Sequence, residues 1–111
     1  MEMTQSDQIV SALAALAQHH RLAVFRMLVE AGPDGLAAGV IATRLDLAPS
    51  SLSFHLAQLE RAGLVSTVRA GRSILYSADF AAMTALIGYL TENCCGGRDC
   101  ASDADAERNA A

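Results

Sequence analysis

The sequence predicts one mainly α-helical domain with a single β-hairpin, and three observations support this fold class. Apolar residues recur at helical spacing along most of the chain, and two short β-branched runs lie at residues 64–69 and 73–77. The length of 111 residues, 52% of them hydrophobic, suits one compact core.

No stretch approaches the roughly 20 uncharged apolar residues of a membrane span. Residues 1–7 are polar and acidic, unlike a signal peptide. We therefore expect a cytoplasmic protein without a membrane segment.

The elements are expected in the order of four helices, two strands and a last helix. Apolar spacing predicts helices over about 5–17, 20–31, 37–45, 50–62 and 79–92. Thr4 or Ser6 is expected to cap the first helix and Asp79 the last, while Ser50 is either a cap or a first-turn residue. The runs 64–69 and 73–77 predict a two-stranded hairpin with Gly71 at its tip.

Two short helices at 37–45 and 50–62, joined by a tight turn and followed by a hairpin, make a winged helix-turn-helix arrangement. In this arrangement the second helix enters the DNA major groove and the hairpin, or wing, reaches the neighbouring backbone or minor groove. The charge distribution agrees, because only residues 36–78 carry more arginines than carboxylates, although the whole chain has a net charge of −4.

In the helix at 50–62, Leu52, Leu56 and Leu59 are expected to form a buried stripe. The other faces of this helix are then exposed and can contact a partner. The candidates for DNA contact are Ser50, Ser51, Ser53, Phe54, His55 and Gln58 on this helix, and Arg72 at the wing tip. Phe54 points outward and suits a thymine methyl group, but it is also compatible with an isolated exposed aromatic. His55 lies at the edge of the stripe, where a structural hydrogen bond is favoured over base contact. Arg72 is a candidate for phosphate or the minor groove, with a solvated turn residue as its alternative.

These residues resemble a known family. The stretch 49–65 (PSSLSFHLAQLERAGLV) is similar to the recognition-helix signature of the ArsR/SmtB bacterial repressors, and 71–77 (GRSILYS) is similar to their wing. The resemblance covers roughly residues 5–100. It implies a homodimer built through the first and last helices, a palindromic double-stranded operator, and release of DNA when an inducer binds. Helices 5–17 and 79–92 agree, since they carry more apolar residues than a small core can hide.

The three cysteines, Cys94, Cys95 and Cys100, all follow the last helix and are the candidate inducer ligands. Adjacent thiols do not easily bond to each other, but with a third thiol five residues further on they can form a cup of three sulfurs. A trivalent thiophilic ion, As(III) or Sb(III), needs three sulfurs, whereas Zn(II) needs a fourth ligand. Zn(II), Cd(II) or another soft cation, thiol oxidation and incidental cysteines remain alternatives, and the sequence does not separate inorganic from methylated arsenite.

The stretch 91–97 (TENCCGG) resembles the end of arsenic-responsive family members, and the chain lacks two other sites of the family. It has no cysteine pair in the helix at 37–45 and no histidine between residues 79 and 92. We therefore expect a DNA-binding and dimerisation domain over 1–93 and a cysteine-containing tail over 94–111. A thiol enzyme is disfavoured because the cysteines follow a helix C-terminus, where the dipole opposes a thiolate. A metal-binding interaction protein would leave the wing and recognition helix without a role.

Overall fold

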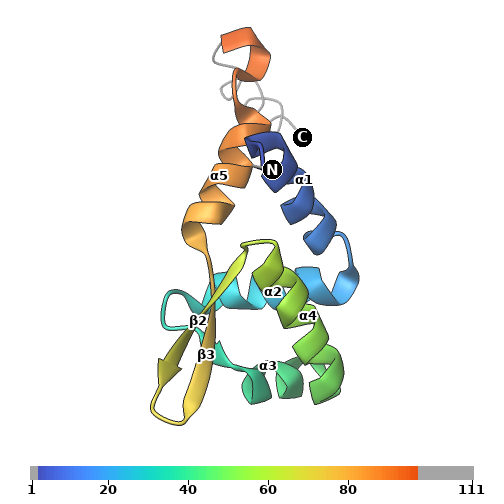
Figure 1. Cartoon of the computed structure of the whole chain (residues 1–111), viewed down its shortest axis with the longest axis vertical. Coiled ribbons are helices and arrows are strands. Elements are labelled where there is room, and N and C mark those ends of the chain that lie inside the picture. Colours follow the sequence, from blue (N-terminus) through green and yellow to red (C-terminus); the bar gives the residue numbers. More distant parts are fainter. Residues whose placement is uncertain (1–2, 98–111) are drawn as a thin grey trace, which may run out of the picture.

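The computed structural model describes residues 3–97, and Figure 1 shows the arrangement of the elements. This part of the chain contains five α-helices, a three-stranded antiparallel sheet with strand order β1-β3-β2, and a short 3-10 helix. The elements are α1 (Gln5–Leu16), α2 (His19–Ala31), β1 (Leu36–Ala37), α3 (Ala38–Leu45), α4 (Pro49–Arg61), β2 (Val65–Ala70), β3 (Ser73–Ala78), α5 (Phe80–Thr91) and the 3-10 helix η1 (Cys94–Gly97). None of the helices in residues 3–97 is long and apolar enough to cross a membrane.

Side-chain caps set the starts of the outer helices, as the sequence predicts. The hydroxyl of Thr4 accepts a hydrogen bond from the Asp7 amide while the Asp7 carboxylate accepts one from the Thr4 amide, which is a capping box. The carboxylate of Asp79 accepts a hydrogen bond of 2.9 Å from the Ala82 amide at the start of α5. Gln18 caps α2 through a bond of 3.0 Å from the Arg21 amide.

The helix α4 begins at Pro49, one residue earlier than predicted, and Ser50 is a first-turn residue rather than the cap. Ala48 is the N-cap and makes no side-chain capping bond. Proline is favoured at the first helical position because it has no amide hydrogen to leave unsatisfied and its φ is already helical. The tight turn before it uses a left-handed residue, Asp46, with φ of 52°.

The sheet contains one strand more than the predicted two-stranded hairpin. The wing forms as expected from β2 and β3, with Ala70 paired to Ser73 across a two-residue turn that starts at Gly71. The additional strand, β1, pairs Leu36 with Tyr76 and Ala37 with Leu75 of β3. Two residues are too few to show the alternation that identifies a strand in sequence. This third strand attaches the base of the wing to the helical core.

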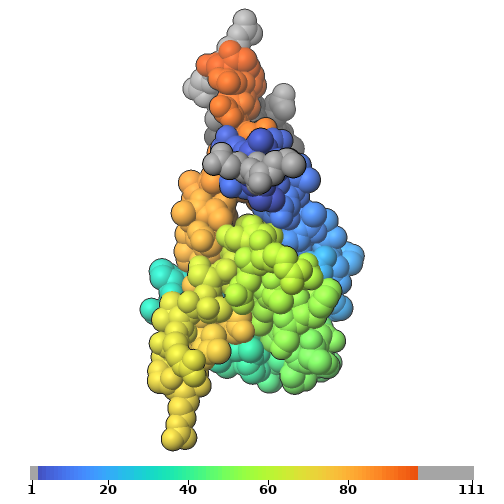
Figure 2. All heavy atoms as spheres, in the orientation of Figure 1, coloured from blue at the N-terminus to red at the C-terminus, as the bar shows by residue number. Residues whose placement is uncertain are grey.

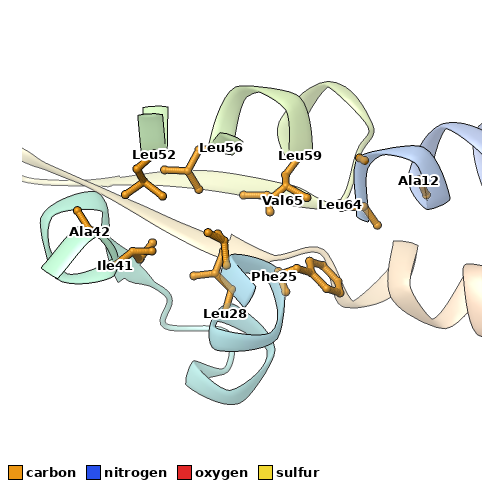
Figure 3. Close-up of a cluster of buried hydrophobic side chains, with 13 residues drawn as sticks. Ala12, Phe25, Leu28, Ile41, Ala42, Leu52, Leu56, Leu59, Leu64 and Val65 are labelled. Atoms are coloured by element: carbon orange, nitrogen blue, oxygen red, sulfur yellow. The ribbon is translucent and has the colours of Figure 1, made fainter. Parts of the chain in front are cut away.

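The hydrophobic core lies between α2, α3, α4 and the start of β2 (Figure 3). The predicted stripe of α4 is buried, with Leu52, Leu56 and Leu59 each at most 1% exposed. Leu28 of α2 and Ile41 of α3 are fully buried opposite this stripe. Burial on this side fixes the orientation of α4, so its other side faces outward.

Candidate nucleic-acid interface and thiol site

The outward face of α4 carries four of the residues predicted to contact DNA. Ser50, Ser51, Ser53 and Phe54 are all exposed, and Phe54 keeps 57% of its surface accessible although it is a large aromatic residue. At 1.5 Å per residue, the 13 residues of α4 span about 20 Å. A helix of this size with one side free fits into a major groove about 12 Å wide. The fold therefore presents small hydroxyl side chains and one apolar ring at the position where a recognition helix reads bases.

His55 lies at the edge of the buried stripe of α4, next to this exposed face. The residue is buried, and its ring contacts the ring of Phe54 edge-on, with centroids 5.8 Å apart. Burial, with the charges of Arg21 and His20, lowers the pKa of His55 below 6.5. Its Nδ1 atom makes no hydrogen bond within residues 3–97, so the structural hydrogen bond favoured from the sequence is not formed at this atom. This placement favours a packing role over contact with a base edge.

The wing carries Arg72 away from the body of the molecule. Arg72 follows Gly71 at the tip and is exposed, and Figure 2 shows the wing as a narrow projection from the globular part. Arg69, near the end of β2, is exposed on the same projection. Neither arginine makes an ion pair within residues 3–97. Both positive charges are therefore available to an anionic partner.

A basic pocket beside α4 was missed by reasoning from the sequence. It lies between α1, the first turn of α2 and the second half of α4, with a volume of about 320 Å³. Its polar lining consists of Ser11, Arg21, Gln58 and Arg61. Gln58, half-buried, was predicted as a DNA contact, but Arg21 lies 37 residues earlier in the chain. The available signal was the helical spacing that places Arg61 on the same face as Ser50 and Phe54.

The sulfur atoms of Cys94 and Cys95 lie next to each other just beyond the end of α5. Their Sγ atoms are 3.8 Å apart and both residues are exposed. The chain reaches this geometry through a tight turn, in which Asn93 and Cys95 both have φ of 56° and the Gly96 amide donates a 2.8 Å hydrogen bond to the Asn93 carbonyl. Cys100, the third predicted ligand, lies outside the described residues.

The separation of the two sulfurs is compatible with a shared ligand. A thiolate binds a metal such as zinc at about 2.3 Å, so two sulfurs separated by less than twice that length can bind one ion. Within residues 3–97, no group of three or more His, Cys, Asp or Glu side chains is arranged to hold a metal. The described residues therefore provide two adjacent cysteine sulfur atoms and no complete metal site.

Comparisons with known proteins agree with this fold. Residues 16–68 match a family model described as a helix-turn-helix domain. The chain is 35% identical over 85 residues to the transcriptional activator HlyU of Vibrio cholerae, covering 77% of this chain and 76% of that protein. Among solved structures, an ArsR-like transcriptional regulator from Rhodococcus sp. RHA1 has a TM-score of 0.71 and 27% identity, with 95% of this chain and 90% of that chain covered.

A second structure adds the assembly state of a relative. The homodimeric winged helix-turn-helix DNA-binding domain of Mb0332 from Mycobacterium bovis, described as a possible ArsR-family regulator, has a TM-score of 0.63 and 27% identity, covering 84% of this chain and 86% of that one. These relatives are transcriptional regulators and not enzymes. The winged helix-turn-helix architecture and these likenesses place the chain in the ArsR/SmtB family of transcriptional regulators.

Proposed function

We propose that this chain is a metalloid-responsive repressor, which binds operator DNA as a homodimer and releases it when As(III) or Sb(III) binds the C-terminal cysteines. Residues 1–93 would bind DNA and form the dimer, and residues 94–111 would sense the metalloid. The observation that carries the proposal is the pair of Sγ atoms 3.8 Å apart immediately after α5, in a chain with a complete recognition helix and wing.

The DNA-binding part of the proposal assigns roles to residues by their exposure. Ser50, Ser51 and Ser53 would bond to base edges or phosphates, and Phe54 would contact a thymine methyl group. Gln58 would reach the DNA from the second half of the helix. His55 would support the orientation of α4 from its buried side. Arg72 would contact the backbone or minor groove from the wing tip.

Dimer formation is supported by apolar side chains that one copy leaves exposed. In Figure 1, α1 and α5 extend together from the core, and each keeps large apolar residues accessible. Val10 on α1 is 61% exposed, and Ile87 and Leu90 on α5 are 54% and 59% exposed. Adjacent exposed apolar helices indicate a protein interface. A second copy is the proposed partner because a two-fold dimer would place two recognition helices about 34 Å apart, in successive major grooves of a palindrome.

Cys94, Cys95 and Cys100 would hold the metalloid as a set of three thiolates. As(III) or Sb(III) supplies a soft centre that binds three sulfurs at once. Because only two residues separate Cys94 from the end of α5, a metalloid bound at this turn would bear directly on the end of a helix in the proposed dimer interface. The ligand shifts the equilibrium between DNA-binding and released dimers only by its different affinity for the two. A coupling free energy of about 1–3 kcal/mol would weaken operator binding roughly 5- to 150-fold.

An anisotropy titration tests the proposal. A fluorescent duplex, selected from a random library by the wild-type protein, is titrated with the reduced protein, with or without arsenite. We expect arsenite to weaken binding of the wild type and to have no effect on Cys95→Ser at the same concentration. Zn(II) in a parallel arm tests the alternative cation. Release of the Cys95→Ser variant at an unchanged arsenite concentration would overturn the proposed sensor site.

A further inference from the structure

The basic pocket between α1, α2 and α4 has no role in the family resemblance or in the proposed thiol site. Two arginines from distant parts of the sequence, Arg21 and Arg61, contribute to one concave surface of about 320 Å³. Ser11 and Gln58 add two neutral polar groups, and two alanines of α1 with Ala62, the C-cap of α4, form the rest of the wall. Such a set of donors is complementary to an oxyanion rather than to a cation.

Arg21 is held in place by its own backbone and side-chain bonds. Its Nε atom donates a 2.7 Å hydrogen bond to the carbonyl of Ala15, one of the last four carbonyls of α1 that have no partner within the helix. The Gln18 side chain accepts a bond from the Arg21 amide. This anchoring at Nε leaves the two Nη groups of the guanidinium for a ligand, in a geometry that suits two oxygens of one phosphate.

The positive charge of the pocket is not balanced by carboxylates. Neither Arg21 nor Arg61 makes an ion pair with any acidic residue in the described part of the chain. The field of Arg21 extends to the contact between α2 and α4, where it contributes to lowering the pKa of His55. A pocket with two unpaired guanidinium groups attracts anions.

Arg61 connects the pocket to the face of α4 that reads DNA. It lies seven residues after Phe54 and eleven after Ser50, which places all three on one side of the helix at 100° per residue. The distance along the axis from Ser50 to Arg61 is about 16 Å at 1.5 Å per residue, longer than the roughly 12 Å width of the major groove. If the first turn of α4 lies among the bases, Arg61 is therefore at the level of a phosphate backbone.

The pocket and the wing lie on opposite sides of α4. Figure 1 shows the wing extending to one side of this helix and the junction of α1 and α2 on the other. We infer that the basic pocket receives a phosphodiester of the operator backbone. Arg21 and Arg61 then bind the backbone on one side of the major groove, while the wing contacts the DNA on the other side. This inference rests on the proposed DNA binding and adds a second backbone contact, which fixes the orientation of α4 in the groove.

The dependence of duplex affinity on salt concentration tests this contact, with the selected duplex and no metalloid. Each lost phosphate contact makes the slope of log affinity against log salt shallower by about one. We expect this change for Arg61→Ala and for Arg21→Gln, with affinity about tenfold weaker at physiological salt. Arg26→Ala is the matched control, because Arg26 is exposed on α2 and does not line the pocket.

Further variants separate the contact from a structural role of Arg21. Arg21→Lys keeps the charge, so it should retain the wild-type salt slope even if its thermal stability falls. Unchanged slopes for Arg61→Ala and Arg21→Gln, with a shallower slope for Arg72→Ala, would overturn the inference and leave the proposed function intact. A wild type that shows no salt-dependent duplex binding would overturn the proposed function itself.

An oxyanion free in solution is the other possible source of the ligand. Inorganic phosphate is compared with chloride at matched ionic strength, with thermal stability as the readout. If phosphate stabilises the wild type but not Arg61→Ala, while the salt slopes of the two for DNA are equal, the pocket binds a free anion and the backbone contact is overturned.

Discussion

The rings of His20 and His55 lie with their centroids 5.5 Å apart and their planes inclined by 41°. This contact joins the first turn of α2 to the middle of the recognition helix. His20 is exposed and close to Gln18, whereas His55 is buried with an unsatisfied Nδ1. The orientation of α4 therefore depends in part on a buried imidazole whose charged form is disfavoured.

Acidification is expected to destabilise the protein through His55. Burial, with Arg21 and His20 contributing, lowers the folded-state pKa of His55 below 6.5, so the unfolded chain binds the proton more readily. The free energy of unfolding should fall as the pH drops below about 6.5, and continue to fall until the folded-state pKa is passed. Thermal unfolding followed by circular dichroism between about pH 8 and pH 5.5 measures this dependence.

Two variants isolate the contribution of His55 from that of other titrating groups. His55→Leu removes the titration and should lose less stability on acidification than the wild type. His19→Gln changes an exposed histidine of the same helix as His20 and should follow the wild-type curve. Parallel curves for the wild type and His55→Leu would contradict the prediction.

Gly35 should resist substitution more strongly than Gly32. Gly35 has φ of +73°, and a Cβ there would overlap the carbonyl oxygen of Tyr76 on β3. Gly32 has φ of +83° but open space around it, so alanine there meets backbone strain alone, about 1–3 kcal/mol. Gly35→Ala should meet a similar backbone strain and, in addition, push β3 away from β1, because the new Cβ would overlap the Tyr76 carbonyl. Urea unfolding should show the larger loss for Gly35→Ala, and equal losses would contradict the role of this close approach.

The parts of the fold that were predictable are those with a local signature. The buried stripe of Leu52, Leu56 and Leu59 follows from helical spacing, and the caps Thr4 and Asp79 follow from side-chain chemistry at helix starts. The strand β1 was missed because its two residues pair only with a distant strand. For the same reason, Arg21 and Arg61 come to line one pocket only after α1, α2 and α4 have packed.

For the candidate DNA-binding and cysteine sites, the sequence predicted which residues take part but not their detailed geometry. The spacing identified the exposed serines and Phe54, but not how far His55 is buried, because its stripe boundary depends on how α2 packs against α4. The positive φ values at Asn93 and Cys95 were also not predictable, since non-glycine residues rarely adopt them. The distance between the two sulfurs depends on this turn.

Phe54 is expected to contact a thymine methyl group. The effect on affinity of removing this methyl should therefore depend on whether Phe54 is present. Replacing thymine by uracil at the contacted position removes one methyl, worth about 0.8 kcal/mol or roughly fourfold in affinity. The wild type should show this loss, and Phe54→Ala should bind the two duplexes equally. Anisotropy titrations with each thymine of the half-site replaced in turn measure the coupling. An equal uracil penalty in both proteins at every position would remove Phe54 from base readout.

Leu90 is expected to lie within the dimer interface, although it is 59% exposed in one copy. A glutamate there would place a charge against apolar surface of the second copy, which costs far more than loss of the leucine contact alone. Leu90→Glu should weaken dimerisation by about 2–4 kcal/mol, or roughly 30- to 1000-fold, and weaken binding to the palindrome with it. Val40→Glu changes a partly exposed apolar residue of α3, away from α1 and α5, and should leave the dimer intact. Sedimentation velocity at micromolar protein gives the readout: a Leu90→Glu protein that stays folded and sediments as a dimer places the interface elsewhere.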